Sequence, residues 1–220
     1  MDDERALPSS IAAAVDHELV IKKSRFLAHL EPVASLEQAD AAVARVRKLH
    51  WDARHHCVAL IVGSDADRQR SSDDGEPAGT AGVPMLEVLR RRDLTDLVAV
   101  VTRYFGGVLL GAGGLARAYS GAVAAALDAA ELVRRVELVE ARLDVPHADA
   151  GRLESALRDW ADAHDAVFED PSYADRVQFG LLVPPARRDQ LTADLAALSA
   201  GAIVPAFAGR RVVSRRALIG

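Results

Sequence analysis

A glycine-rich stretch between an apolar strand and an apolar helix constrains the fold of this 220-residue chain more than any other feature. Residues 97–101 predict a buried strand, and the apolar pattern that follows predicts a helix from about residue 113 to 133. Five glycines lie between residues 102 and 114. Glycine loses more backbone entropy on folding than any other residue, so this density is useful only where φ is positive or another surface approaches the backbone. The junction is therefore the first candidate for a functional site.

The rest of the first half alternates between predicted strands and helices. Ser35 is a good N-cap for a helix over residues 36–50. A second helix begins near Pro84 and ends in three arginines, which suit a helix C-terminus. Residues 64–82 are rich in Gly, Pro, Ser and Asp and predict one long loop, of a length that is usually functional or disordered. The expected strands are 18–21, 24–30, 56–62 and 94–102.

The second half predicts a separate domain. Its elements follow the order β-α-β-β-α-β, which is typical of the split βαβ or ferredoxin-like arrangement. The boundary falls near residues 134–137, so we expect domains at 1–136 and 137–220. The expected strands are 137–145, 166–169, 177–183 and 202–213, and the expected helices are 148–164 and 187–198.

Composition excludes several classes of protein. No apolar run approaches the roughly 20 residues that span a bilayer, and the acidic N-terminus does not resemble a secretory signal. The single cysteine, Cys57, excludes an intramolecular disulfide and a cysteine-rich zinc site. The net charge of −5 argues against nucleic-acid binding by bulk charge, although a local basic groove remains compatible with it. We expect a cytoplasmic protein with no membrane partner and no DNA sequence specificity.

Several motifs together resemble the IMPACT (YigZ-type) family in its bacterial two-domain form. They are Asp-Asp-Gly-Glu-Pro at 73–77, Gly-Thr-Ala-Gly at 79–82, Val-Thr-Arg-Tyr-Phe-Gly-Gly at 101–107, and the glycine-rich segment at 110–120, with weaker matches at 22–26 and 53–57. The resemblance implies an α+β protein with an N-terminal domain like domain 2 of ribosomal protein S5. It also implies a ferredoxin-like C-terminal domain, in a tandem similar to the last two domains of elongation factor G. Eukaryotic relatives are linked to control of translation, so the implied partners are the ribosome, RNA or a translation factor.

The acidic loop allows two interpretations. Asp73, Asp74 and Glu76 place three carboxylates within four residues, and carboxylate oxygens are ligands that Mg²⁺ or Ca²⁺ prefer. Asp-Gly is also a strong turn signal, in which Asp side chains bond nearby backbone groups. The spacing lacks the full ligand set of an EF-hand, and the turn interpretation is favoured.

The glycine-rich junction also allows two interpretations. Free N–H groups at a helix N-terminus favour an anion, and Arg103 and Arg117 flank the glycines. Tight packing of strand against helix would explain the same glycines. Tyr119 could stack on a base or pack in the core. His55 could act as a general base, although no nucleophile is identifiable beside it, so a structural histidine is favoured.

The preferred hypothesis is a translation-associated binding protein without catalytic chemistry, which binds through a face formed by the acidic and glycine-rich loops. We expect no catalytic residue, no metal and no cofactor. One alternative is a Mg-dependent enzyme acting on a nucleotide or phosphorylated small molecule, and another is a protein–protein adaptor. The candidate ligand-binding residues are Asp73, Asp74, Glu76, Thr80, His55, Arg103, Gly106, Gly107, Gly111, Gly113, Gly114, Arg117 and Tyr119.

Overall fold

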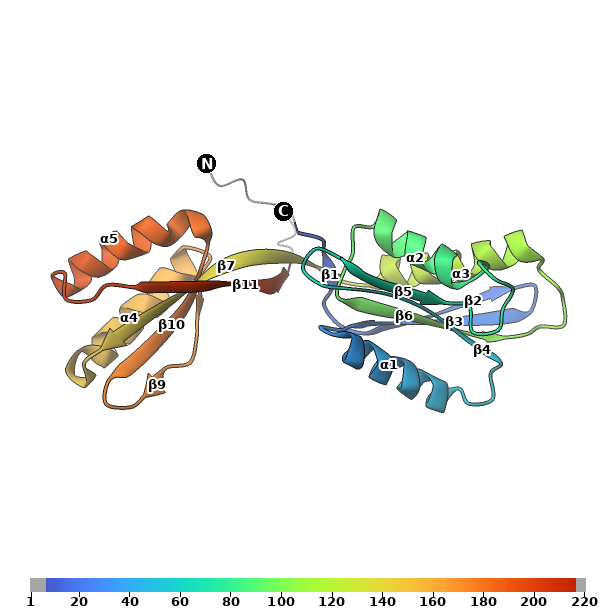
Figure 1. The fold of residues 1–220 in the computed structure, drawn as a ribbon, viewed down its shortest axis with the longest axis horizontal. Helices are drawn as coiled ribbons and strands as arrows, with labels where there is room; N and C mark the ends of the chain where they lie inside the picture. Colours follow the sequence, from blue (N-terminus) through green and yellow to red (C-terminus); the bar gives the residue numbers. More distant parts are fainter. Residues whose placement is uncertain (1–6, 217–220) are drawn as a thin grey trace. The chain divides into compact units, whose positions relative to one another are not determined.

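The computed structural model describes residues 7–216, which form two compact units (Figure 1). The N-terminal unit comprises residues 7–135 together with 214–216, and the C-terminal unit comprises residues 136–213. Each unit combines helices with a β-sheet. The chain is therefore a mixed α/β protein of two domains, as the sequence predicts.

An antiparallel sheet of five strands forms the centre of the N-terminal unit. Its strand order is β2-β3-β6-β4-β5, so β6 lies in the middle and β2 and β5 form the two edges. The strands are β2 (Val15–Ile21), β3 (Ser24–Pro32), β4 (His55–Val62), β5 (Arg68–Ser72) and β6 (Leu97–Tyr104).

Helices cover both faces of this sheet (Figure 1). α1 (Leu36–Leu49) lies on one face, and α2 (Gly82–Arg91) and α3 (Ala112–Ala129) lie on the other. This arrangement explains why β4 and β6 are apolar without alternation, because both of their faces are buried. Val98 and Val100 contribute to the core beneath α1, and the alternate residues Leu97, Ala99 and Val101 contribute to the core beneath α2 and α3.

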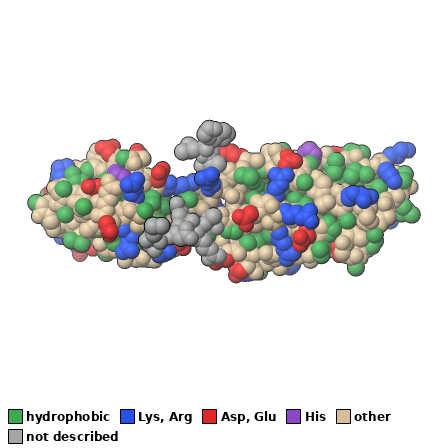
Figure 2. Space-filling model, turned by 90° about the horizontal axis from the view of Figure 1, so that it is seen from above, with side chains coloured by type: hydrophobic (Ala, Val, Ile, Leu, Met, Phe, Trp, Pro, Cys, Tyr) green, Lys and Arg blue, Asp and Glu red, His purple; other side chains and the backbone are tan. Residues whose placement is uncertain are grey.

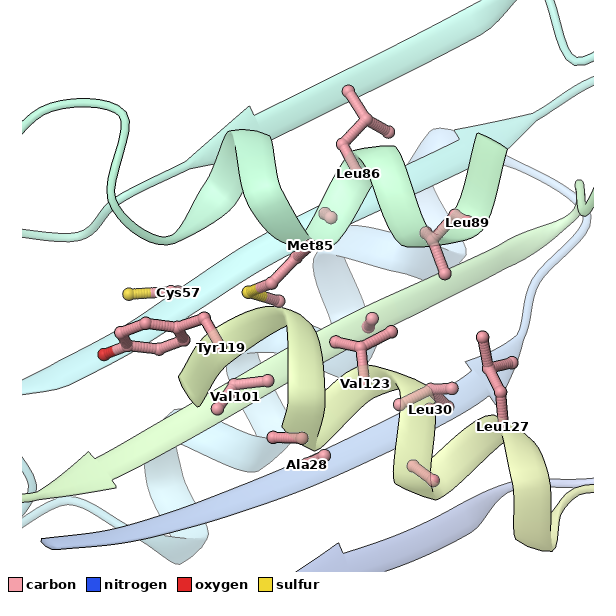
Figure 3. Close-up of a cluster of buried hydrophobic side chains, with 14 of the residues drawn as sticks. Ala28, Leu30, Cys57, Met85, Leu86, Leu89, Val101, Tyr119, Val123 and Leu127 are labelled. Atoms are coloured by element: carbon pink, nitrogen blue, oxygen red, sulfur yellow. The ribbon is translucent and has the colours of Figure 1, made fainter. Parts of the chain in front are cut away.

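The larger core lies between the sheet and the pair α2 and α3 (Figure 3). Met85 and Leu89 of α2 and Val123 of α3 are fully buried in it. Along α3, buried alanines recur at helical spacing and allow the helix to approach the sheet closely; they are Ala118, Ala122 and Ala126. Leu30 of β3 packs into the same cluster with no exposed surface.

The predicted start of α1 is confirmed. Ser35 has an extended conformation, and its hydroxyl accepts a hydrogen bond from the backbone N–H of Gln38 at 3.3 Å. The Gln38 side chain reaches back and accepts from the N–H of Ala34 at 2.7 Å. Two backbone donors at the helix start are thereby satisfied.

Two expectations for the N-terminal unit are wrong. The polar segment 64–82 is not a continuous loop, because β5 lies within it and pairs with β4. β5 is a largely exposed edge strand and needs no apolar side chains. Its sequence therefore lacks a strand pattern and resembles the turn residues on either side. The third helix ends at Ala129 rather than near Val133, and β7 (Leu132–Val145) begins directly after it.

The early start of β7 has a tertiary cause. Leu132 and Val133 pair with the short strand β1 (Ser10–Ile11). Arg135 is buried because its guanidinium pairs with Asp96 at 2.8 Å. The domain boundary expected at residues 134–137 therefore lies inside a strand rather than in a linker.

In the C-terminal unit the strands follow the order β11-β7-β10-β8, with β9 also pairing with β10. β7 and β10 are antiparallel in the middle. Leu153, Phe179 and Leu195 belong to its core. The remaining elements are α4 (His147–Ala163), β8 (Val167–Phe168), β9 (Ser172–Tyr173), β10 (Val177–Val183), the 3₁₀ turn η1 (Pro185–Arg187), α5 (Arg188–Ser199) and β11 (Ala206–Arg216).

The helices also differ from membrane-spanning segments. Among residues 7–216, no helix has both the length and the apolar character that crossing a bilayer requires.

Substitution of Leu30 tests the position of the main core. Leu30→Ala should lower the free energy of unfolding by about 2–5 kcal/mol, because it leaves a cavity in a fully buried cluster. Leu109→Ala is the control, since Leu109 is 84% exposed and its loss should change stability by less than about 0.5 kcal/mol. Urea-induced unfolding followed by circular dichroism gives both values. Equal effects of the two substitutions would contradict this assignment of the core.

Candidate functional site

The two loops singled out by sequence meet at one end of the five-stranded sheet. We call residues 73–82 the acidic loop and residues 105–114 the glycine loop. The register pairs Arg103 of β6 with His55 of β4 and with Phe26 of β3. The acidic loop leads into α2 and the glycine loop leads into α3. The turn between β2 and β3 lies at this same end of the sheet (Figure 1).

A buried ion pair connects the acidic loop to the end of β6, and a hydrogen bond connects it to α3; these two elements flank the glycine loop. Arg103 donates from Nη1 to Oε1 of Glu76 at 2.7 Å, and the Tyr119 hydroxyl donates to the same oxygen at 2.7 Å. The side chains of Arg103 and Glu76 are only 8% and 4% exposed, and Tyr119 is fully buried. The Arg103 guanidinium also lies 5.5 Å from the ring centroids of both Phe26 and Phe105. Arg103 is therefore part of the interior rather than a free cation at the surface.

Asp73 caps the start of α2. Its carboxylate accepts hydrogen bonds from the backbone N–H groups of Gly79, Ala81 and Gly82 at 2.7, 3.0 and 2.8 Å. Partial burial raises the pKa of Asp73, but these three donors outweigh it and hold the pKa below its ordinary value. An internal anion thus occupies the N-terminus of α2.

Asp74 and Gly75 form the turn that the sequence favours. Both have positive φ, at 43° and 84°. The Asp74 carboxylate accepts from the backbone N–H of His56 at 2.7 Å and pairs with Arg47 at 2.6 Å. Its carbonyl oxygen lies 2.9 Å from Nδ1 of His55, which places that imidazole under the turn.

Cys57 and Thr80 have structural contacts. The Cys57 thiol donates to the carbonyl of Asp73 at 3.0 Å, and burial raises the pKa of this thiol to about 12. It therefore stays protonated at neutral pH and is a poor nucleophile. Tyr119 lies beside it (Figure 3), and burial raises the pKa of its hydroxyl as well. The Thr80 hydroxyl donates to the carbonyl of Pro77 at 2.6 Å.

The glycines of the glycine loop serve different purposes. The backbone of Gly106 lies against the β2–β3 turn, where a Cβ would fall 2.0 Å from the carbonyl carbon of Lys23. Its N–H donates to the Ser24 hydroxyl at 3.1 Å. Gly107 and Gly111 have φ of 83° and 70° with open space beside them. The positive φ, rather than crowding, explains glycine at these two positions.

The N-terminus of α3 differs from that of α2. Gly111 is its N-cap residue, and no side chain within residues 7–216 caps the helix. Gly113 is exposed in the first turn of the helix. Gly114 is half-buried, and a Cβ at this position would lie 3.0 Å from the Cβ of Leu110. In the part of the chain that the structure describes, the first backbone N–H groups of this 18-residue helix therefore have no side-chain acceptor.

Exposed cations lie on this helix and on the turn beside the glycine loop. Lys22 and Lys23 form the adjacent β2–β3 turn, and Nη1 of Arg117 lies 3.9 Å from where a Cβ on Gly113 would be. Within residues 7–216 none of these three cations forms an ion pair. Figure 2 shows Lys and Arg side chains at the right-hand end of the N-terminal unit, the end that carries the glycine loop.

The predicted site residues thus fall into three groups. Glu76, Arg103 and Tyr119 converge in the interior, while Asp73, Asp74, Thr80 and His55 organise the acidic loop. The exposed group consists of Gly107, Gly111, Gly113 and Arg117, beside the half-buried Gly106 and Gly114. Lys22 and Lys23 also belong to the exposed group, although they are not among the residues predicted from the sequence. Two consecutive lysines between two predicted strands are the sequence feature that could have indicated them.

The geometry does not favour metal chemistry in the acidic loop. Its three carboxylates are directed at backbone N–H groups, at Arg47, or at Arg103 and Tyr119. Nowhere in residues 7–216 do three or more His, Cys, Asp or Glu side chains form a group suited to a metal ion.

Comparison with known proteins gives consistent matches over both units. Residues 22–127 match the Impact N-terminal domain, and residues 143–202 match a domain of unknown function, DUF1949. The IMPACT family member YvyE of Bacillus subtilis is 41% identical over 170 residues, which cover 77% of this chain and 76% of that protein. The family member YigZ of Escherichia coli is 40% identical over 185 residues, covering 83% and 89% of the two chains. A solved crystal structure of a hypothetical protein aligns with a TM-score of 0.66 at 38% identity, covering 91% of this chain and 97% of the other.

Replacement of two glycines separates close approach from flexibility. Gly106→Ala should destabilise the protein by about 1–3 kcal/mol, because the new Cβ meets backbone atoms of the β2–β3 turn. Gly113→Ala is the matched control in the same loop region, where the nearest atom is a flexible arginine nitrogen at 3.9 Å. It should leave stability unchanged or raise it by up to about 1 kcal/mol, since Ala favours a helix. Urea midpoints measure both, and a Gly106→Ala protein as stable as the wild type would refute the close contact.

Asp73 should give stability a specific dependence on pH. Because its folded pKa is lowered, its contribution is complete above the ordinary carboxyl pKa of about 3.9 and is lost as pH falls through the lower folded value. Asp73→Asn should therefore cost about 1 kcal/mol at pH 7, with the difference from the wild type shrinking below about pH 4. Urea unfolding at pH 7, 5, 4 and 3 follows this change. Asp175→Asn, at an exposed position of the C-terminal unit, is the control, and a pH-independent Asp73→Asn difference would contradict the capping role.

Proposed function

Since the chain belongs to the IMPACT family, we propose that it is a translation-associated regulator that binds the ribosome, RNA or a translation partner. The family's eukaryotic members are linked to control of translation, which supports the general role. The glycine loop, the start of α3 and the β2–β3 turn form the proposed binding face. The acidic loop lies beneath this face and is held in place by the contact of Glu76 with Arg103.

We also propose a fold for each domain. Residues 1–136 would form an S5 domain 2-like domain and residues 137–220 a ferredoxin-like domain, in a tandem similar to the last two domains of elongation factor G. The strand order β11-β7-β10-β8 supports the second assignment, because ferredoxin-like sheets place the last strand beside the first and the second at the opposite edge.

One observation carries the choice of face. Lys22, Lys23 and Arg117 are exposed without ion-pair partners in the described chain. They lie on the β2–β3 turn and in the early part of α3, beside a helix N-terminus that no described side chain caps. Backbone N–H groups, the helix dipole and three cations all favour an anion at this place. Phosphate groups of RNA fit this chemistry, and exposed Phe105 beside them offers a surface for a base.

The engaged carboxylates favour this role over the alternative of a magnesium-dependent enzyme. Asp73 and Asp74 already accept hydrogen bonds from the backbone, and Glu76 is neutralised by Arg103. Recruiting them for a metal would leave α2 uncapped and Arg103 buried without its partner.

Removal of two cations from the face tests the proposal. The double variant Lys22→Gln/Arg117→Gln should bind single-stranded RNA about tenfold more weakly at low salt. It should also reduce the slope of log affinity against log salt by about 1.4, or roughly 0.7 for each lost phosphate contact. The matched control is Arg91→Gln/Arg134→Gln, which removes the same charge from exposed positions outside this face. Fluorescence anisotropy and co-sedimentation with ribosomes provide the readouts.

Arg103 is unsuitable for this experiment, since its loss would leave Glu76 buried without its ion partner. No binding to RNA or ribosomes at low salt would refute the nucleic-acid form of the proposal. Equal losses in the test and control variants would refute the assignment of the face. If the protein captures a translation factor but binds no RNA, the result would favour a protein as the partner.

A further inference from the structure

Exposed apolar side chains of the N-terminal unit are concentrated at one end of its sheet. Trp51, in the turn between α1 and β4, is 81% exposed, and Leu49, the last residue of α1, is 74% exposed. Phe105, Val108 and Leu109 of the glycine loop are exposed as well. Single exposed apolar residues are ordinary in soluble proteins, but a group of them rimmed by polar residues marks an interaction site.

A hydrogen bond joins the two parts of this group. The Tyr104 hydroxyl donates to the carboxylate of Asp52 at 2.9 Å. Asp52 directly follows Trp51, and Tyr104 directly precedes Phe105. Because β4 and β6 are paired from His55 onward, the turn before β4 and the glycine loop after β6 leave the sheet at the same end (Figure 1). Each of the two aromatic residues is therefore one residue away from the same hydrogen bond.

Both aromatic rings are available to a partner. Trp51 forms no hydrogen bond, ion pair or ring contact with any other residue in the described part of the chain. Such exposure is uncommon for an indole, since tryptophan is highly buried on average. Phe105 is 56% exposed, with the Arg103 guanidinium 5.5 Å from its ring centroid.

Unpaired cations accompany both rings. Lys48 and Arg54 lie within three residues of Trp51, and both are exposed. The three exposed cations of the proposed binding face lie beside the glycine loop. None of these five forms an ion pair with residues 7–216. The carboxylates of the acidic loop are already engaged, so the charge of Asp52 leaves this end with a surplus of positive charge in a chain whose net charge is −5.

A partner for this end must supply several negative charges together with flat apolar groups. An unpaired RNA strand has both, since each nucleotide carries a phosphate and a base that can stack on an aromatic ring. In duplex RNA the bases are stacked on one another and cannot reach the rings. An anionic lipid surface also combines charge with apolar groups, but the carboxylate of Asp52 adjoins Trp51, and its transfer into an apolar layer is costly.

We propose that this end of the N-terminal sheet binds an unpaired RNA strand, with one base stacked on Trp51 and another on Phe105. Phosphates on either side of these bases lie against the unpaired cations. Such binding rests on the function proposed above and deepens it, because it specifies single-stranded RNA. It also extends the binding face from the glycine loop to the turn between α1 and β4.

Affinity for paired and unpaired RNA tests this site on the full-length protein. Fluorescence anisotropy compares a labelled single strand with a duplex of the same sequence and length. The single strand should bind at least about tenfold more tightly, because the duplex keeps its bases stacked. Attraction by charge alone would favour the duplex instead, since its charge density is higher.

Substitution of Trp51 tests the stacking contact. Trp51→Ala should weaken single-strand binding about tenfold through loss of one stacked base, with the salt dependence unchanged. Trp51→Phe should recover most of the affinity, because an aromatic ring remains. Tyr173→Ala is the matched control, since it removes an exposed aromatic ring from the C-terminal unit. The melting temperature of each variant distinguishes lost binding from lost folding.

Intrinsic fluorescence reports the same contact directly. The chain has two tryptophans, Trp51 and Trp160, and Trp160 is only 8% exposed. Stacking of a base on Trp51 should quench its emission when the single strand is added. Trp51→Phe retains only Trp160 and should lose this quenching.

Removal of the two cations beside Trp51 separates this extension from the face proposed above. Lys48→Gln/Arg54→Gln should weaken single-strand binding about tenfold at low salt and lower the slope of log affinity against log salt by about 1.4. The control double variant described above should do neither. If Lys22→Gln/Arg117→Gln weakens binding and Lys48→Gln/Arg54→Gln does not, the function proposed above stands and the extension is overturned.

Several other results would overturn the assignment of single-stranded RNA. They are equal binding of single strand and duplex, an equal loss in Tyr173→Ala and Trp51→Ala, and displacement of the RNA by polyglutamate at equal charge concentration. Co-sedimentation with vesicles of phosphatidylcholine and phosphatidylglycerol that Trp51→Ala abolishes, while RNA binding is unchanged, would assign this end to a lipid surface instead. Absence of all RNA binding would overturn this assignment together with the nucleic-acid form of the proposed function.

Discussion

The buried carboxylate of Glu76 is the contact on which the candidate site depends. It accepts from Arg103 at the end of β6 and from Tyr119 inside α3, so one oxygen joins the acidic loop, the sheet and the long helix. Two charges removed from water gain little net stability from their own attraction, yet removal of either partner costs about 3–5 kcal/mol because the other stays buried. The pair is therefore better understood as a constraint on position. It holds the acidic loop against the base of the glycine loop, and the other contacts of both loops build on that arrangement.

This constraint explains why two similar helix starts behave differently. The acidic loop folds back so that Asp73 accepts three backbone donors at α2, which satisfies that helix internally. The glycine loop supplies no such side chain to α3, and its N-cap residue is itself a glycine. The dipole of α2 is compensated by Asp73, whereas the N-terminus of α3 remains available at the surface for an anion.

Local sequence was sufficient for elements whose signals are contained within a few residues. The Ser35 cap, the unbroken apolar strands β4 and β6, and the turn at Asp74 and Gly75 all follow from such signals. The family motifs also correctly identified the loops that meet at the end of the sheet. The end of α3 depends on neighbours that a local pattern does not contain. The helical signal runs past Ala129 because alanine, leucine and valine continue, and only pairing with β1 turns Leu132 and Val133 into a strand.

The role of Arg103 was hidden for a similar reason. An arginine beside glycines suggests a ligand, but its actual partner lies 27 residues earlier in the chain and is reached only through the folded loop.

The edge strand β5 has a consequence for the protein's behaviour in a crowded solution. A free sheet edge can extend by recruiting the edge of another molecule, and apolar edges do so most readily. Here the exposed strand reads Arg-Gln-Arg-Ser-Ser, with Arg68 and Arg70 two positions apart. Guanidinium groups keep their charge at every physiological pH, and Arg70 pairs with Asp40 of α1, so pairing this edge with another chain would take charged groups out of water. The polarity that made β5 resemble a loop in the sequence therefore disfavours edge-to-edge pairing of this sheet.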